Sequence, residues 1–167
     1  RLWWRSPLRR LEAEALRDAM LAVSGTLDTA LGGSLLHVDN RAYFFDHTSK
    51  DQTRYNVPRR SLYLPVVRNH LYDVFTLFDY TDASVLNGNR ATTTVAPQAL
   101  FLLNSSLVES SSRQIATRLL ALPATDNAER IDRLYERVLS RPASRLEIRL
   151  AERFLDSVTP SLPVKSV

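Results

Sequence analysis

The sequence has no cysteine among its 167 residues. This absence excludes disulfide bonds, thiolate metal sites, cysteine nucleophiles and covalent attachment of c-type haem within the chain. No apolar run approaches the roughly 18–20 residues of a membrane-spanning helix, so no span is expected. The basic, interrupted start RLWWRSPLRR is unlike a signal peptide, and Trp3 and Trp4 have no visible partner nearby. We therefore interpret Arg1 as an internal cut in a longer protein.

Motifs that would name a reaction are also missing. There is no phosphate-binding loop, no dinucleotide fingerprint and no nucleophile elbow of the G-x-S-x-G kind. Three histidines, His37, His47 and His70, are too scattered for a zinc motif, so no metal site is expected, although His37 or His70 could serve as an axial haem ligand. Two acidic loops lack the spacing of a calcium-binding loop, and we interpret them as solvated turns. Their oxygen-bearing residues are Asp39, Asp46 and Asp51, then Asp79, Asp82, Asn87 and Asn89.

Basic charge comes almost entirely from arginine, because Lys50 and Lys165 are the only lysines. The net charge is +4, and many arginines alternate with acidic residues along helical segments such as residues 130–137. That pattern is typical of a solvated helix surface rather than of a nucleic-acid interface. No nucleic-acid partner is expected.

Periodicity predicts helices in the first two thirds of the chain. Residues 11–23 are good helix formers with an apolar stripe, and Gly25 stops them. The stripe consists of Leu11, Ala15, Ala19 and Val23, with Leu16 and Met20 beside it. Residues 65–78 predict a second helix that opens at Pro65 and buries Val67, Leu71, Val74, Phe75 and Phe78. A third begins at Pro97, with Ala99, Leu100, Leu103 and Leu107 on its face, and Asn104 either caps a further segment to Leu122 or lies mid-helix.

Two aromatic and branched runs, residues 42–45 and 60–64, predict a small β-hairpin. In the last third, Asp126 with Glu129 and Ser144 with Glu147 have the spacing of capping boxes ahead of two amphipathic helices. The predicted fold is mainly α, with about five helices, one small β-hairpin and a terminal helical hairpin. Its domains are a main helical domain over residues 1–122 with the hairpin insertion at about 41–65, a helical hairpin packed on it over 123–157, and a tail over 158–167.

Polar residues in the stretch 59–104 stand among large apolar ones. A buried polar group must find hydrogen bonds or cost a few kcal/mol, so these residues form either a structural network or a polar surface facing a ligand. The candidate site residues are Arg60, Arg68, Arg90, Gln98 and Asn104, with Asn69 beside them. No catalytic residue is assigned.

Five runs of this sequence resemble the planctomycete family known as domain of unknown function 1553, in its C-terminal part. They are RRLEAEALRDAMLAVSG, RRSLYLPVVRN, LFDYTDAS, NRATTTVAPQALFLLN and RIDRLYERVLSRP. The resemblance implies a large exported protein, in the periplasm or at the cell surface, that often carries a c-type cytochrome domain. Any haem would belong to the rest of that protein, because this chain lacks the cysteines. The run 33–57 matches the family least.

Three functions remain open at this point. The leading hypothesis is a non-catalytic structural or interaction module, whose partner is the remainder of its own polypeptide or an associated subunit. The second is a domain of an enzyme acting on an extracellular polysaccharide or another polymer. The third is an electron-transfer partner that contacts haem.

Overall fold

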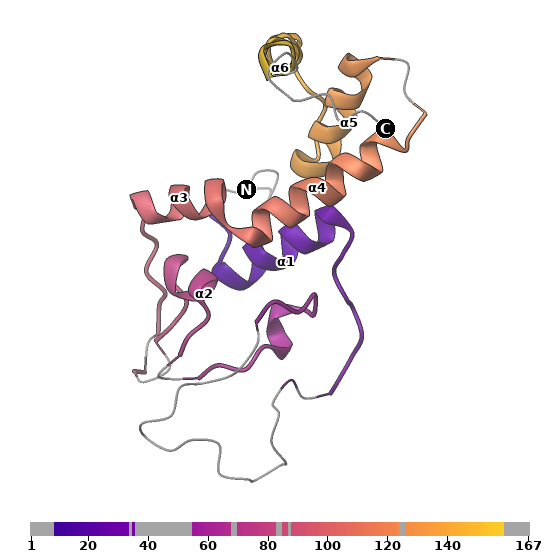
Figure 1. Ribbon diagram of the computed structural model, residues 1–167. Coiled ribbons are helices and arrows are strands. Elements are labelled where there is room, and N and C mark those ends of the chain that lie inside the picture. The colour runs from indigo at the N-terminus through magenta and orange to yellow at the C-terminus, as the bar shows by residue number, and fades with distance from the viewer. Residues whose placement is uncertain are drawn as a thin grey trace, which may run out of the picture. The chain divides into compact units, whose positions relative to one another are not determined.

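The computed structural model describes residues 9–33, 35, 55–67, 70–82, 85–86, 88–123 and 126–158. Within these ranges the chain is mainly helical, and its only β pairing consists of isolated bridges (Figure 1). No described helix is long and apolar enough to cross a membrane. The elements are α1 (Ala13–Ser24), the 3-10 helix η1 (Ser61–Tyr63), α2 (Asp73–Leu77), α3 (Ala96–Asn104), α4 (Ser106–Leu120), α5 (Asn127–Leu139) and α6 (Arg145–Val158).

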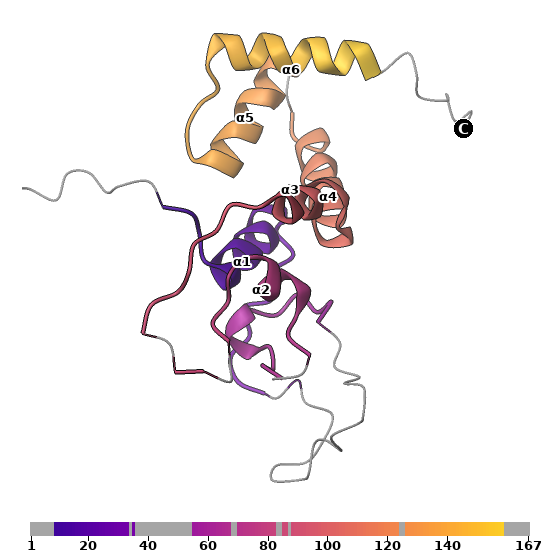
Figure 2. The ribbon, with the colours of Figure 1, turned by 90° about the vertical axis from the view of Figure 1, so that its left-hand side faces the viewer.

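Two compact units divide the chain, Arg1–Ser112 and Arg113–Val167. The boundary falls inside α4. In the first unit, α1 packs against α2 and η1 (Figure 2). In the second, α5 packs against α6. The mainly helical prediction is therefore confirmed.

The predicted β-hairpin is not found. Its second run forms the 3-10 turn η1 instead of a strand, while its first run, residues 42–45, lies outside the described residues. The turn has a clear cause in Asp18 of α1. Its carboxylate accepts hydrogen bonds from the Ser61 N–H at 2.8 and 3.1 Å and from the Ser61 hydroxyl at 2.7 Å. A carboxylate that satisfies the first N–H of a turn favours that turn over an extended strand.

Helix α1 ends where the sequence predicts, with Gly25 in the left-handed region at φ 72°. Its buried face, however, is not the predicted stripe. The buried residues are Ala13, Arg17, Leu21 and Ser24, whereas Leu11 and Ala15 are exposed. An arginine in the middle of a buried face breaks the apolar period, so periodicity alone selects the wrong side of the helix.

The core of the first unit brings together Ala13 of α1, apolar side chains of α2 and the residue after it, and two side chains from the segments around η1. Phe75 and Val74 are completely buried, and each such side chain stabilises the fold by about 1.5–3 kcal/mol. The prediction that the residues before α2 are buried holds for Val67, but the helix begins at Asp73 rather than Pro65. Val67 and His70 form a bridge, with a 3.2 Å bond from the His70 N–H to the Val67 carbonyl, which keeps that run out of the helix.

Helix α3 begins as expected, with Pro97 in its first turn and the Gln98 side chain accepting a hydrogen bond from the Val95 N–H at 3.2 Å. The apolar face predicted for it is wrong, because Leu100 and Leu103 are 59% and 80% exposed. The buried residue of α3 is the polar Gln98, whose side-chain amide forms hydrogen bonds with backbone groups.

Both helices of the second unit begin at side-chain caps that the sequence predicts. The Asp126 carboxylate accepts the Glu129 N–H at 2.8 Å at the start of α5. At α6 both bonds of the capping box form, from the Ser144 N–H to Glu147 at 2.8 Å and from the Glu147 N–H to Ser144 at 3.3 Å. The two helices follow one another through Arg141 and Pro142, as in the predicted helical hairpin.

Candidate functional site

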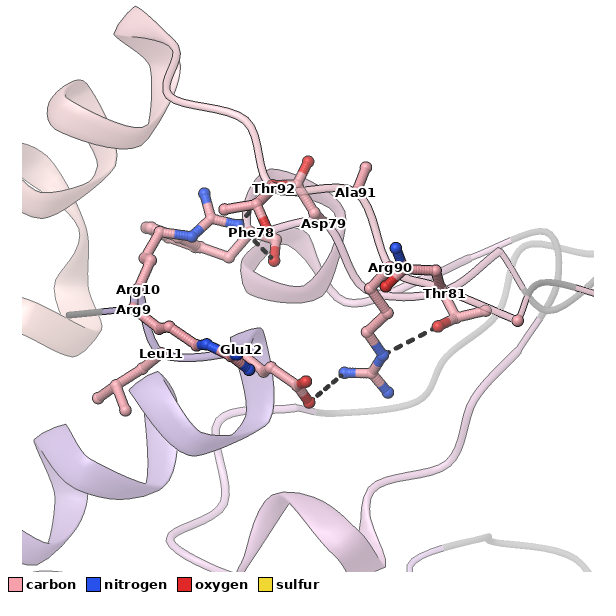
Figure 3. A pocket seen from close by; sticks show the side chains of 12 residues that line it. Arg9, Arg10, Leu11, Glu12, Phe78, Asp79, Thr81, Arg90, Ala91 and Thr92 are labelled. Carbon is pink, nitrogen blue, oxygen red and sulfur yellow. Dashed lines mark hydrogen bonds and ion pairs between the residues drawn. The ribbon is translucent and has the colours of Figure 1, made fainter. Parts of the chain in front are cut away.

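An open pocket of about 740 Å³ lies in the first unit. Its walls are the residues just before α1, the turn after α2 and the strand-like run that leads to α3. Charged side chains dominate these walls and come from both sides of the pocket (Figure 3). The charged and hydroxyl-bearing residues of the lining are Arg9, Arg10, Glu12, Asp79, Thr81, Arg90 and Thr92.

One side of the pocket is built on Asp79, which follows α2 with a left-handed backbone at φ 60°. Its carboxylate accepts the Thr93 N–H at 2.8 Å, the Thr93 hydroxyl at 2.9 Å and the Arg10 guanidinium. Arg10 also donates to the Thr93 carbonyl. The Thr93 N–H above all, and then Arg10, hold the pKa of Asp79 below its usual value despite some burial. Asp79 therefore joins three separate segments as an anion.

The other side is built on Arg90. Its guanidinium binds both carboxylate oxygens of Glu14, at 2.7 and 2.9 Å, and one oxygen of Glu12 at 3.0 Å. Its Nε donates to the Thr81 hydroxyl at 2.9 Å (Figure 3). The guanidinium also lies 4.9 Å from the centre of the Tyr80 ring. The hydrogen bond to Glu14 raises the pKa of Arg90. Burial acts to raise the pKa of Glu14, but the bonds from Arg90 and from its own backbone lower it on balance.

Gln98 connects the start of α3 to the turn after α2. Its amide nitrogen donates to the Leu77 carbonyl at 2.9 Å and to the Thr93 carbonyl at 3.2 Å, while its oxygen binds the Val95 N–H. Both ends of the amide are therefore occupied by the backbone, so Gln98 holds the structure rather than facing a ligand.

The other residues named from the sequence do not join this cluster. Arg60 precedes η1 and is exposed. Asn104 is the last residue of α3, where its exposed amide donates to the Leu100 carbonyl at 2.9 Å. Arg68 and Asn69 lie outside the described residues. Among the candidates that the structure describes, Arg90 lines the pocket and Gln98 binds Thr93, which is also bound by Asp79 of the pocket wall. Arg60 and Asn104 lie elsewhere.

Sequence reasoning missed Arg17, which is 1% exposed and is the most deeply buried charge among the residues that the structure describes. Its guanidinium donates to the Val57 carbonyl, to the Arg59 carbonyl at 2.8 Å and to the Ser61 hydroxyl at 3.3 Å. The group also lies 5.7 Å from the centre of the Tyr72 ring. The available signal was the charged pair Arg17–Asp18 in the middle of a mostly apolar helix, but a pair on the protein surface has the same appearance in sequence.

The histidines form no site within the described chain. The His70 ring stacks on Tyr55 with centres 5.9 Å apart, and its carbonyl accepts the Tyr55 hydroxyl at 3.0 Å. His37 and His47 lie outside the described residues. Across the ranges that are described, no three histidine, aspartate or glutamate side chains come together as metal ligands would.

The second unit has a different feature, a set of exposed apolar side chains on α6. Leu146, Leu150 and Phe154 are 57%, 54% and 66% exposed, and no residue of α6 is fully buried. An amphipathic helix normally buries its apolar face, so this uncovered strip is the second candidate site.

These features define a class of protein: a helical module whose segments are joined by hydrogen bonds and ion pairs of its arginines. It has a pocket lined by charged side chains and an exposed apolar face on α6. The chain belongs to the family described as "Protein of unknown function (DUF1553)", whose model matches residues 1–155. The resemblance seen in the sequence is confirmed at this level. Neither a curated protein nor a solved structure matches the chain.

Proposed function

We propose that this chain is a non-catalytic structural and interaction module of a larger exported protein. One observation carries the proposal: the charged groups that converge on the pocket are bound to one another. Arg90 is closed by Glu12 and Glu14, and Arg10 by Asp79. Arginines whose N–H groups are already bound by carboxylates hold segments of the chain together. Few of their hydrogen-bond donors remain for a substrate.

The direction of the pKa shifts supports the same conclusion. A general acid or base works best when its pKa lies near the working pH. The pKa values of Glu14 and Asp79 are instead lowered, away from neutrality, and the pKa of Arg90 is raised. These shifts stabilise the charged form of every partner, which is the behaviour of ion pairs that maintain a fold.

The family resemblance extends the proposal to the setting of the module. We infer that the longer protein is exported and that a c-type cytochrome domain accompanies this one. The module would then bind the remainder of its own polypeptide or an associated subunit. The uncovered apolar strip on α6 supports binding of that kind, because such strips commonly mark protein interfaces.

A second candidate function is recognition of a polysaccharide as part of a polymer-acting enzyme. The observation in its favour is that Arg9 and Thr92 line the pocket without a hydrogen bond from either side chain to any described residue. Sugar hydroxyl groups pair readily with such donors.

A binding experiment separates the two candidates. The full chain is titrated calorimetrically with soluble xylan, pectin and chitin oligosaccharides, and the mixtures are assayed for cleavage products. The structural proposal predicts no heat of binding and no cleavage. Binding that Arg9→Ala and Thr92→Val both abolish would overturn it in favour of the enzyme domain.

A further inference from the structure

The strip on α6 has a regular geometry. Leu146, Leu150 and Phe154 follow one another at intervals of four residues, which places them along one side of the helix. Ile148 and Ala151, on the neighbouring part of the helix surface, are half-buried. The helix has 14 residues, a length of about 20 Å at 1.5 Å per residue. The strip from Leu146 to Phe154 covers about 12 Å of that length, which is enough to take about two turns of another helix.

A row of arginines borders this strip. Arg145, Arg149 and Arg153 are exposed and share the interval of four residues. Arg149 lies three residues after Leu146 and Arg153 three after Leu150, so each pair is adjacent on the helix surface. None of the three guanidinium groups has a hydrogen bond or ion pair to any residue that the structure describes. These arginines therefore offer guanidinium N–H donors beside an exposed apolar surface.

Two acidic residues, Glu152 and Asp156, lie three residues after Arg149 and Arg153 and so border this row on its side away from the strip, but neither forms an ion pair with a described arginine. Glu147 lies on the opposite flank of the strip and is bound by Arg141 at 2.7 Å and by the Ser144 N–H at 2.8 Å. Each residue is rotated by 100° from the one before it, so Arg153 lies beside Leu146 and Leu150 on the helix surface. Glu152 and Asp156 are rotated farther away from these two leucines. One flank of the strip therefore carries Arg149 and Arg153, which have no described ion pair, and the other flank carries Glu147, which Arg141 already binds.

We propose that this strip is the docking site for an amphipathic helix of another protein, one whose apolar face is bordered by aspartate or glutamate. Charge complementarity carries the choice of partner: leucine-type side chains would cover Leu146, Leu150 and Phe154, while carboxylates pair with Arg149 and Arg153. The inference rests on the proposed function as an interaction module and names the surface and the chemistry of its partner.

A second copy of this chain fits the surface less well. In a two-fold antiparallel pair of α6 helices the same flanks meet, so the arginine rows would face each other. In a parallel pair the row meets the flank of Glu147, whose carboxylate is already bound. An anionic lipid surface fits less well too, because α6 has as many acidic residues as arginines, whereas such helices carry an excess of cations.

Two synthetic helical peptides test the proposal. Both carry leucines at the same positions along one face; one has glutamate on the flanks of that face and the other has lysine. Their affinities for the full chain are measured by fluorescence anisotropy at low and high salt. We expect the glutamate peptide to bind about tenfold more tightly, a difference that two exposed ion pairs can supply and that salt reduces.

Variants of the chain sharpen the test. Leu150→Ser with Phe154→Ser should abolish binding of the glutamate peptide, and Leu86→Ser, at another exposed leucine, should not change it. Arg149→Glu with Arg153→Glu should reverse the preference, so that the lysine peptide binds more tightly. All of these side chains are exposed, and circular dichroism checks that each variant keeps its helices.

Three results would overturn the proposal. The first is equal affinity for the two peptides. The second is a dimer in sedimentation that Leu150→Ser with Phe154→Ser dissociates, which would make a second copy the occupant. The third is binding to phosphatidylcholine–phosphatidylglycerol vesicles that the same variant abolishes. The oligosaccharide titrations are independent of all three, so failure of the docking proposal is distinguishable from failure of the proposed function.

Discussion

Arg90, which lines the pocket, forms a two-point ion pair with Glu14, with N–O distances of 2.7 and 2.9 Å. The two residues are separated by 76 positions in the chain. One belongs to the first turn of α1 and the other to the run that leads to α3. Their pairing therefore ties the segment between α2 and α3 to the first helix. It also occupies the guanidinium of Arg90, which the sequence offers as a candidate for ligand binding.

Arg17 is expected to contribute more to stability than any other charged residue of the first unit. Arg17→Ala should lower the free energy of unfolding by about 3–5 kcal/mol, because it leaves the half-buried Val57 and Arg59 carbonyls and the buried Ser61 hydroxyl without this donor. Arg17→Lys should cost less, since one ammonium group replaces part of the bonding. Urea unfolding followed by circular dichroism measures both.

Arg60→Ala is the matched control for Arg17, since Arg60 is exposed. Its effect should stay within about 0.5 kcal/mol. Equal losses from Arg17→Ala and Arg60→Ala would contradict the structural role of the buried arginine.

The sequence names both Gln98 and Asn104 as candidate site residues, but in the structure Gln98 is buried and Asn104 is exposed. Gln98→Ala should cost about 1–3 kcal/mol, because the Leu77 and Thr93 carbonyls lose the donor that the buried Gln98 amide supplies. Asn104→Ala should change stability by less than about 0.5 kcal/mol, since water replaces its exposed bond to the Leu100 carbonyl. Thermal unfolding of the two variants side by side checks this difference, and a larger loss for Asn104→Ala would refute it.

The cap of α6 is expected to depend on pH. Arg141 above all, and then Ser144, lower the pKa of Glu147 from 4.5 to about 2. Because the folded-state pKa is the lower one, the carboxylate's contribution to stability is complete above about pH 4.5 and is lost as the pH falls toward 2. Titration of the Glu147 carboxyl by carbon-13 NMR measures the pKa directly.

Arg141→Ala should raise the pKa of Glu147 toward its usual value, and Ser144→Ala should raise it less, in keeping with the order of the two causes. A Glu147 that titrates near 4.5 in the unchanged chain would show that the capping box is open in solution.

Local signals in the sequence predicted the helix boundaries better than the buried faces. Gly25, Pro97 and the Ser144–Glu147 pair act on neighbouring backbone groups, so their effect is visible in a short window. The buried face of α1 depends on Arg17 meeting carbonyls about 40 residues away, which no periodicity records. The β-hairpin failed for the same reason, since Asp18 reaches Ser61 across 43 positions and draws it into a turn.

The sequence could name only some members of the polar cluster around the pocket, for a related reason. Arg90 and Gln98 stand out in it because they are polar residues within an apolar stretch. Arg10 and Asp79 were missed as a pair because one stands before α1 and the other follows α2, and only the fold brings them together. Charge patterning reports which residues lie on a helix face, but it does not report which arginine meets which carboxylate across the chain.

A double-mutant cycle on Arg90 and Glu14 tests the central claim most directly, namely that the polar cluster holds the fold together. The unfolding free energies of Arg90→Ala, Glu14→Ala and the double variant are compared with that of the unchanged chain, and Arg9→Ala serves as the control in the same pocket. We predict a coupling energy of about 1 kcal/mol between Arg90 and Glu14, and none between Arg9 and Glu14. A coupling energy near zero for Arg90 and Glu14 would contradict the account.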